Sequence, residues 1–204
     1  MNIVALMPAS KVMEIAAVQS LISFQSAIYN RKDNVTIAFS NGFNAAKART
    51  FLLKYANDQK ADWIIWLDSD HVYNAKAMYE MIDKMELYGL DILSAKYYVR
   101  DATLDKVTAH GNFSPDGFKK FYEPIDSSSG SIIDCDVIGL GFCIMRPSLV
   151  KKLIDTYALD LFKFDLDDNS TEDVYFCRQV KKLGARICFD NDSKIGHLTT
   201  VIHT

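Results

Sequence analysis

Two carboxylates directly follow one of the most apolar stretches of the sequence. The run Trp63–Leu67 is apolar at every position and leads into Asp68, Ser69 and Asp70. A short apolar run bounded by polar residues is typical of a strand buried on both faces of a parallel sheet, and ligands of such sheets bind beyond the carboxyl ends of the strands. Two neighbouring carboxylates repel each other unless a cation lies between them. Their oxygens suit Mg²⁺ or Mn²⁺, so the pattern predicts a metal site, although Asp-Ser-Asp is also ordinary turn and helix-capping chemistry.

Three further groups of residues, in the second half of the sequence, could take part in catalysis or ligand binding. Glu172 and Asp173 stand in the first turn of a predicted helix, where the helix dipole favours carboxylates even without a catalytic purpose. Gly139 and Gly141 separate two predicted strands, where glycines mark either a bend or a close approach of the backbone to a bound ligand. His197 follows a glycine near the end of the sequence. Each group has a purely structural alternative.

Length, composition and charge limit the class of protein. The chain has 204 residues, 49% of them hydrophobic, and these numbers predict one domain with one sizeable core. A net charge of -3 argues against nucleic acid as a partner. No apolar run approaches the ~20 residues of a transmembrane segment, and no secretory leader is evident, so we expect a cytoplasmic protein. The four cysteines lie in apolar segments and are expected to be buried free thiols.

Hydrophobic periodicity predicts an α/β fold. Strands at 3–7, 35–39 and 63–67 alternate with helices at 15–28 and 44–55, an order typical of parallel pairing with right-handed crossovers. A helix capped by Asn74, a strand at 91–95, strands at 132–138 and 142–145, a helix capped by Ser148, a helix ending at Gly184 and a strand at 186–189 complete the prediction. Neither a Gly-x-Gly-x-x-Gly nor a P-loop sequence is present, so phosphates would need another partner, for which a bound metal is the natural candidate.

The order of these features resembles the GT-A class of nucleotide-sugar glycosyltransferases, nearest to the family 2-like inverting enzymes. The resemblance rests on a first strand ending in Pro8, the Asp-x-Asp after a buried strand, the glycines between two strands, Glu172-Asp173 at a helix start and the late His197, and it spans Ile3 to His197. It extends to glycosyltransferase domains that large DNA viruses encode within longer proteins, so further domains of a longer chain stay open.

The resemblance implies a fold and a division of labour. The fold would be a GT-A, Rossmann-like, mostly parallel sheet flanked by helices, with a small antiparallel portion. Residues 1–204 would form a single glycosyltransferase domain, with a nucleotide-binding half at 1–100 and an acceptor and catalytic half at 101–204.

The resemblance also implies roles for individual residues. Asp68, Asp70 and His197 would hold Mn²⁺ or Mg²⁺, with Asp68 near the ribose. Asp173, with Glu172 beside it, would be the general base that deprotonates the acceptor hydroxyl. The donor site would comprise Pro8, Ala9, Ser10, Ser40, Asn41, Arg49, Asp68, Ser69, Asp70, Gly139 and Gly141.

The function implied is the transfer of a sugar from a nucleoside diphosphate sugar to a hydroxyl of a glycan or glycoprotein. UDP-sugars, UDP-glucose among them, are the commonest donors of the family, and such an enzyme would serve glycan biosynthesis. A retaining mechanism, which would need no base at Asp173, stays open. The alternatives are a nucleotide-sugar nucleotidyltransferase, a non-catalytic carbohydrate-binding module and, more distantly, an Asp-x-Asp phosphatase, although Val72 replaces the threonine that such a phosphatase requires.

Overall fold

The computed structural model describes residues 1–9, 12–40, 44–99, 107–111, 123–124, 130–164 and 170–198. The helices in this part of the chain are α1 (Ile15–Asn30), α2 (Ala45–Asn57), α3 (Ala75–Tyr88), α4 (Pro147–Tyr157) and α5 (Glu172–Lys182). The strands of the main sheet are β1 (Asn2–Pro8), β2 (Asn34–Ser40), β3 (Trp63–Leu67), β5 (Ile92–Lys96), β8 (Ile132–Asp134), β10 (Phe142–Met145) and β11 (Ile187–Lys194). The remaining strands are β4 (His71–Val72), β6 (Ala109–Gly111), β7 (Glu123–Pro124), β9 (Val137–Ile138) and β12 (Gly196–His197).

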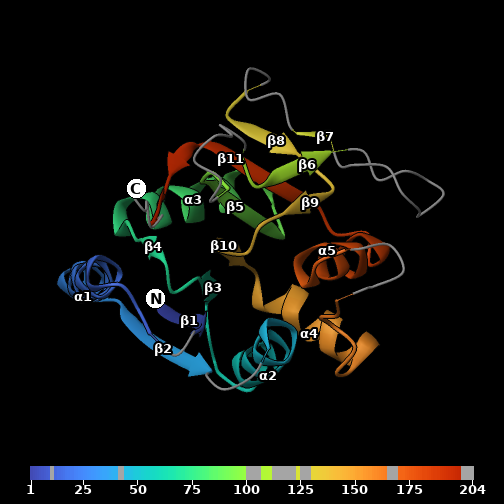
Figure 1. Cartoon of the computed structure of the whole chain (residues 1–204), viewed down its shortest axis with the longest axis horizontal. Coiled ribbons are helices and arrows are strands. Elements are labelled where there is room, and N and C mark those ends of the chain that lie inside the picture. Colours follow the sequence, from blue (N-terminus) through green and yellow to red (C-terminus); the bar gives the residue numbers. More distant parts are fainter. Residues whose placement is uncertain are drawn as a thin grey trace, which may run out of the picture.

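The main sheet has seven strands in the order β2-β1-β3-β10-β5-β11-β8 (Figure 1). Strands β2, β1 and β3 pair in parallel, and β5 pairs in parallel with β11. Strand β10 runs antiparallel between β3 and β5, and β8 runs antiparallel at the edge beside β11. Strands β4 and β12 form a small antiparallel sheet, and β7, β6 and β9 form another. The predicted α/β fold, mostly parallel with a small antiparallel portion, is confirmed.

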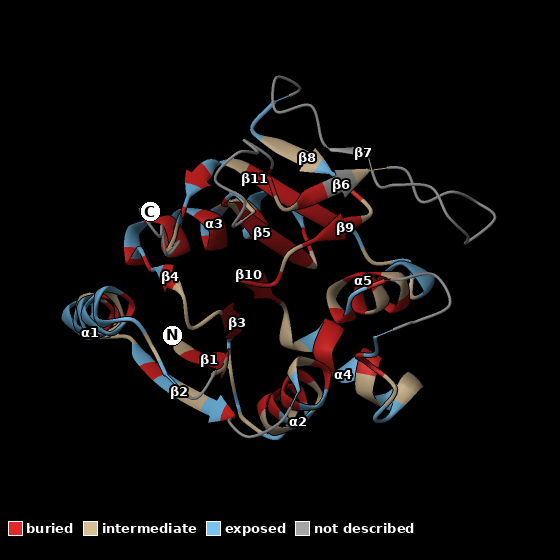
Figure 2. Cartoon of the chain, in the orientation of Figure 1, coloured by how far each residue is buried: buried red, intermediate tan, exposed pale blue. Residues whose placement is uncertain are grey.

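Two hydrophobic layers hold the sheet between its helices. One layer joins one sheet face to α1 and α3, and the other joins the opposite face to α2, α4 and α5. The run 63–67 contributes to both, because alternate side chains of a strand point to opposite faces: Trp63, Ile65 and Leu67 belong to the first layer, and Ile64 and Trp66 to the second. Figure 2 shows the central strands as buried. The prediction of a strand buried on both faces is therefore confirmed.

Local details confirm some predictions and correct others. The side chain of Asn74 accepts backbone hydrogen bonds from Lys76 and Ala77 at the start of α3, as predicted. The predicted cap at Ser148 is wrong, because α4 begins at Pro147 and its N-cap is Arg146. Proline suits the first position of a helix, where a backbone N–H would have no partner within the helix. The predicted strand at 132–138 is also wrong as one strand, because β8 joins the main sheet whereas β9 joins the small sheet with β6.

The four cysteines are confirmed as buried free thiols: they are Cys135, Cys143, Cys177 and Cys188. Within the described ranges, no helix has both the length and the apolar composition needed to cross a membrane. Strands from residues 101–204, among them β10 and β11, lie in the same sheet as the strands of residues 1–100. The division into a donor half and an acceptor half stays a prediction.

Candidate active site

The turn that follows β3 is fixed against the glycine segment 139–141. The backbone N–H of Asp68 donates to the carbonyl oxygen of Gly141 at 2.8 Å. The hydroxyl of buried Tyr73 donates to the carbonyl oxygen of Asp68. The side chain of Asp68 accepts a hydrogen bond from Arg49 at 3.0 Å. The first aspartate of the pair is therefore held by its backbone on one side and by a guanidinium on the other.

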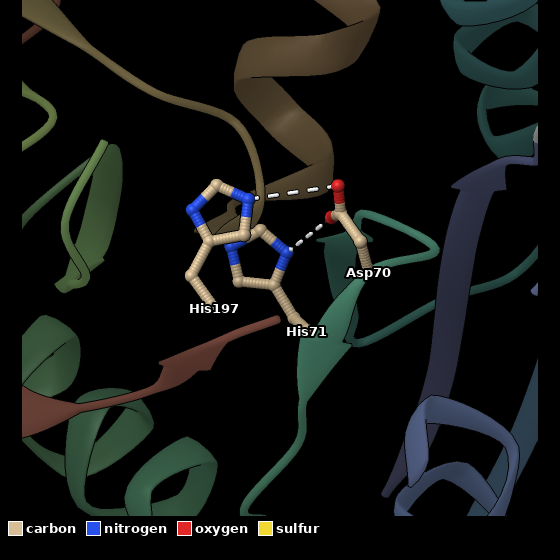
Figure 3. A group of neighbouring side chains, drawn as sticks. All are labelled: Asp70, His71 and His197. Atoms are coloured by element: carbon tan, nitrogen blue, oxygen red, sulfur yellow. Dashed lines mark hydrogen bonds and ion pairs between the residues drawn. The ribbon is translucent and has the colours of Figure 1, made fainter. Parts of the chain in front are cut away.

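Pairing between β4 and β12 brings a distant histidine to the second aspartate. The antiparallel register places His197 opposite His71. Nδ1 of His71 lies 2.9 Å from one carboxylate oxygen of Asp70, and Nε2 of His197 lies 3.5 Å from the other (Figure 3). The two imidazole rings stack, with centroids 4.4 Å apart and planes inclined by 11°. One carboxylate and two imidazoles thus converge, with ligand atoms within 4.8 Å of one another.

The hydrogen bonding of His197 suits a metal ligand. Nδ1 of His197 lies 2.7 Å from the carbonyl oxygen of Tyr98, which can only accept, so Nδ1 carries the proton. A neutral imidazole with this tautomer presents a lone pair at Nε2, on the side of Asp70. A lone pair and a carboxylate facing each other are stabilised by a cation between them. The donor set therefore fits a divalent transition metal.

His71 is a residue that the sequence analysis did not single out. It is 1% exposed, and burial lowers its pKa to about 4; the neighbouring His197 and Arg49 also lower this pKa, whereas Asp68 raises it. The ring is consequently neutral at pH 7, which is the form that binds metals. The only signal in the sequence is its place directly after the second aspartate.

Gly139 and Gly141 leave the space that the side chains of Tyr97 and His71 occupy. The N–H of Gly141 donates to the hydroxyl oxygen of buried Tyr97 at 2.7 Å. A Cβ on Gly141 would lie 2.6 Å from Cε1 of His71 and 2.9 Å from Cζ of Tyr97, closer than real Cβ atoms approach other atoms. A Cβ on Gly139 would collide with the Tyr97 hydroxyl. These glycines permit the close packing of Tyr97 and His71, and their predicted contact with the donor sugar stays a prediction.

This packing predicts the effect of Gly141→Ala. Since neither His71 nor Tyr97 can move into solvent, we expect the substitution to lower the free energy of unfolding by about 1–3 kcal/mol. Chemical denaturation followed by circular dichroism measures it. Gly111→Ala is the matched control, because a Cβ on Gly111 meets nothing within 4 Å. Equal stability of the two variants would contradict the packing argument.

A buried arginine joins the Asp-x-Asp turn to the start of α5. Arg49, from α2, is 4% exposed. Its Nη2 binds Asp68 at 3.0 Å, and its Nε lies 3.5 Å from a carboxylate oxygen of Glu172 and 3.4 Å from one of Asp173. The guanidinium also lies over the ring of Trp66, with Cζ 5.2 Å from the ring centroid. Three carboxylates around one guanidinium leave an excess of negative charge at this point.

Asp173 titrates near neutral pH. Its side chain is 23% exposed, and Oδ2 accepts a long hydrogen bond of 3.4 Å from the backbone N–H of Leu140. Burial raises the pKa of Asp173 to about 7; Arg49 lowers it, and the charges of Glu172 and Asp68 raise it. A helix N-terminus favours the ionised form, so burial outweighs the dipole here. A carboxylate that takes up a proton near pH 7 has the property that a general base requires.

Comparison with known families decides the class of the protein. Residues 18–153, about two thirds of the chain, match the sequence profile of the family described as Glycosyl transferase family 2. The chain belongs to glycosyl transferase family 2. It is therefore a glycosyltransferase, and membership excludes the nucleotidyltransferase, carbohydrate-binding and phosphatase alternatives. Among curated protein sequences, none matches the chain.

Solved structures share the fold of this family 2 glycosyltransferase at low sequence identity. A197 from STIV is similar with a TM-score of 0.59 and 16% identity, over 100% of this chain and 97% of the other. S. aureus TarS 1-349 is similar with a TM-score of 0.57 and 17% identity, over 98% of this chain and 60% of the other. Its complex with UDP-GlcNAc is similar with a TM-score of 0.58 and 16% identity, and the chain again spans 60% of it. These similarities confirm the predicted GT-A fold.

Three of the remaining predicted donor residues, Pro8, Ala9 and Ser40, lie at the ends of the neighbouring strands β1 and β2. Pro8 is paired with Ser40 across β1 and β2, and the N–H of Ala9 donates to the carbonyl oxygen of Ser40 at 3.0 Å. Ser69 lies in the turn between Asp68 and Asp70. Ser10 and Asn41, also predicted, lie outside the described residues.

The predicted metal ligands separate into two places in the structure. Asp70 and His197 meet with His71, whereas Asp68 turns its carboxylate to Arg49. The role of Asp68 as a metal ligand stays a prediction.

Proposed function

We propose that this glycosyltransferase transfers a sugar from a UDP-sugar to an acceptor hydroxyl, with inversion at the sugar carbon. Asp173 is the general base, and Asp70, His71 and His197 hold a Mn²⁺ ion. The observation that carries this proposal is a three-ligand cation group that includes Asp70, in a turn whose other aspartate, Asp68, shares the buried Arg49 with a carboxylate of raised pKa, Asp173. Both are what the departure of a diphosphate and the deprotonation of a hydroxyl require.

The choice of a uridine nucleotide rests on fold similarity. The TarS structures with this fold were determined with UDP-GlcNAc and with UDP. In this chain the ends of β1 and β2 would contact the base and ribose, through Pro8, Ala9 and Ser40. Ser40 is buried, and its hydroxyl has no hydrogen-bond partner among the described residues, so it has a donor to offer.

The choice of Mn²⁺ over Mg²⁺ rests on the donor set. Two imidazole nitrogens and one carboxylate oxygen are a mixed set, whereas Mg²⁺ prefers oxygen ligands and retains several waters. When bound, the ion stabilises the negative charge that develops on the departing diphosphate. Asp70 and the two histidines would hold the ion, and the carbonyl of Tyr98 sets the tautomer of His197.

The acceptor side is proposed from the position of Asp173. Its carboxylate lies at the start of α5, on the same side of Arg49 as Glu172 and beside Leu140. An acceptor hydroxyl that reaches it gives up its proton as its oxygen attacks the sugar carbon on the face opposite the diphosphate. We infer a glycan or glycoprotein acceptor, with residues 101–204 contributing this base.

A donor screen tests the proposed function. We expect UDP to be released from a UDP-sugar in the presence of Mn²⁺, and UDP to bind in calorimetry more tightly with Mn²⁺ than without it. GDP and ADP are the matched controls for the base, and Mg²⁺ is the control for the ion. Binding of GDP or ADP with equal affinity would contradict the uridine assignment, and UDP binding that ignores Mn²⁺ would contradict the metal site. A product with the same anomeric configuration as the donor would contradict inversion.

A further inference from the structure

Within the described part of the chain, the outer side of β2, at the edge of the main sheet, has no neighbouring strand. Among the described strands, only β1 pairs with β2. The N–H of Asn34 donates to Met1, and the carbonyl of Ser40 accepts from Ala9, so the even-numbered residues of β2 turn their backbone groups toward β1. Because alternate residues of a strand point to opposite sides, the N–H and C=O groups of Val35, Ile37 and Phe39 point outward. The hydroxyl of Tyr29 donates to one of them, the carbonyl of Val35.

This edge lacks the features that usually protect a terminal strand. Proteins blunt such edges with charged side chains, proline, bulges or very short strands. The strand Asn34–Ser40 has seven residues, contains neither a charge nor a proline, and pairs with β1 in one unbroken register. Phe39, at its end, is a large apolar side chain that is 52% exposed. The edge is therefore a competent template for another strand.

Helix α1 continues the same surface. The sixteen residues of α1 include no charged residue. Its exposed apolar side chains follow one another at spacings of three, four and seven residues, and seven residues are about two helical turns, so the four lie on one stripe of the kind that pairs helices. They are Ile15 (76% exposed), Val18, Ile22 (60% exposed) and Tyr29. Figure 2 shows much of the outer side of α1 as exposed.

The stripe lies on the flank of α1 that borders β2. Phe24 and Ile28 point into the core, and on one flank Ser20 accepts a hydrogen bond from the N–H of Tyr73, next to β4. The apolar stripe lies on the opposite flank, since its residues are rotated by roughly half a turn from Ser20 at 3.6 residues per turn. Tyr29 belongs to this stripe and reaches the carbonyl of Val35 on the open edge. We call the stripe and the outward side of β2 together the α1–β2 surface.

We propose that the α1–β2 surface binds the same surface of a second copy of this chain about a two-fold axis. The two β2 strands pair antiparallel with the axis at Ile37, so that Val35 of each copy faces Phe39 of the other. This register uses the outward N–H and C=O groups, with the carbonyl of Val35 accepting from the partner strand as well as from Tyr29. It sets β-branched Val35 against aromatic Phe39, a favourable cross-strand pair. The two α1 helices then lie side by side on one face of the joined sheet.

Charge favours a second copy over other occupants. A two-fold axis brings identical residues together, so any charge near the axis would meet its own kind, and α1 and β2 carry none. A helix that lies on a membrane surface typically carries lysine and arginine on its polar face, and α1 has neither. An uncharged, self-complementary surface is what a symmetric pair requires.

The geometry identifies the residue of α1 nearest the axis. Tyr29 is level with Val35, and Ile37 lies two residues further along β2, or about 6.6 Å at the rise of a strand. At about 1.5 Å per residue, this distance corresponds to about four residues of α1, which runs in the opposite direction. The residue at that level is Gln25, which is partly exposed and continues the stripe between Ile22 and Tyr29.

Opposite charges placed at Gln25 test the proposal. We expect the unmodified chain to sediment as a dimer at micromolar concentrations. Gln25→Lys and Gln25→Glu should each raise the dimer dissociation constant at least about tenfold, because like charges meet at the axis. An equimolar mixture of the two variants should recover the dimer, since opposite charges then meet. Recovery on mixing excludes misfolding as the cause of the loss.

Gln19→Lys is the matched control, because Gln19 lies on the same helix, is exposed and falls outside the stripe; it should leave the dissociation constant unchanged. An unmodified chain that stays monomeric would overturn the proposal. So would Gln25 variants that dimerise as tightly as the Gln19 control, or a monomer that cosediments with phosphatidylglycerol vesicles. The test does not involve the active site, so its outcome is independent of the proposed function.

Discussion

Asp173→Asn is expected to lower the rate of sugar transfer by about 10²–10⁴-fold while UDP-sugar binding is retained. Asparagine has nearly the same shape as aspartate and keeps an oxygen that can accept from the N–H of Leu140, so the start of α5 should be preserved. It cannot take a proton from the acceptor hydroxyl. Single-turnover transfer with a bound UDP-sugar separates the two effects, because binding and chemistry are measured on the same sample.

The pH dependence of transfer should report the same carboxylate. With a pKa of about 7 for Asp173, the base is protonated below this pH, and the rate should fall about tenfold for each unit of pH below it. Above pH 7 the rate should reach a plateau. A profile that stays flat between pH 5 and pH 8 would contradict the assignment of Asp173 as the base.

As pH rises from about 4 to 7, the stability of the protein should fall while its activity rises. Burial raises the pKa of Asp173 above its usual value of 3.8, so between about pH 4 and pH 7 the folded chain keeps a proton that the unfolded chain has lost. The free energy of unfolding therefore falls as pH rises through this window. Asp173→Asn removes the fall, so the variant should be more stable than the parent above pH 7, by on the order of 2–4 kcal/mol.

Two control substitutions distinguish a base from a nearby charge. Glu172→Gln removes the neighbouring carboxylate that also lies near Arg49, and it should reduce transfer less than Asp173→Asn. Asp155→Asn changes an exposed aspartate of α4 that pairs with Lys151, and it should leave transfer unchanged. Full turnover by Asp173→Asn, or a larger loss from Glu172→Gln, would remove Asp173 from the base role.

The parts of this fold that could be predicted are those set by local pattern. The run Trp63–Leu67 is short and apolar throughout, so its burial on two faces follows from side-chain alternation. Asn74 precedes a helical pattern, and its capping bonds follow from the chemistry of a short amide side chain. The position of β10 could not be predicted, because Phe142–Met145 has the same apolar pattern as a parallel strand. Its antiparallel place between β3 and β5 depends on long-range pairing.

In the candidate site, too, features set by local pattern could be predicted and those set by long-range pairing could not. Asp70 and His197 were expected to share a cation, but the pairing that joins them comes from β4 and β12, which have two residues each. Such short strands leave no periodicity in a sequence, so His71, which β4 turns toward the site, was missed. For Asp173 the sequence indicated only a helix dipole, which favours the ionised carboxylate. Only packing around Arg49 decides that burial dominates.

Removal of the divalent ion is expected to abolish transfer, and His71→Phe should weaken Mn²⁺ binding at least about 100-fold, since losing an outer-shell partner of a metal ligand alone costs 10–100-fold. Phenylalanine keeps the ring that stacks on His197 and packs against Tyr97, so the substitution removes the nitrogen with little change of shape. Mn²⁺ affinity is measured directly by electron paramagnetic resonance of the free ion, which needs no turnover.

The matched control for His71→Phe is Val72→Thr, a substitution of similar volume at the next position of β4, where the side chain is 39% exposed. It should bind Mn²⁺ as the parent does, because alternate side chains of a strand point to opposite sides and Val72 points away from Asp70. Asp70→Asn should lose Mn²⁺ as His71→Phe does, because the two histidines converge on its carboxylate.

If His71→Phe bound Mn²⁺ like Val72→Thr while Asp70→Asn did not, His71 would be a packing residue. Full transfer in the presence of a chelator would contradict the metal site, because the charge of the departing diphosphate would then be stabilised without an ion.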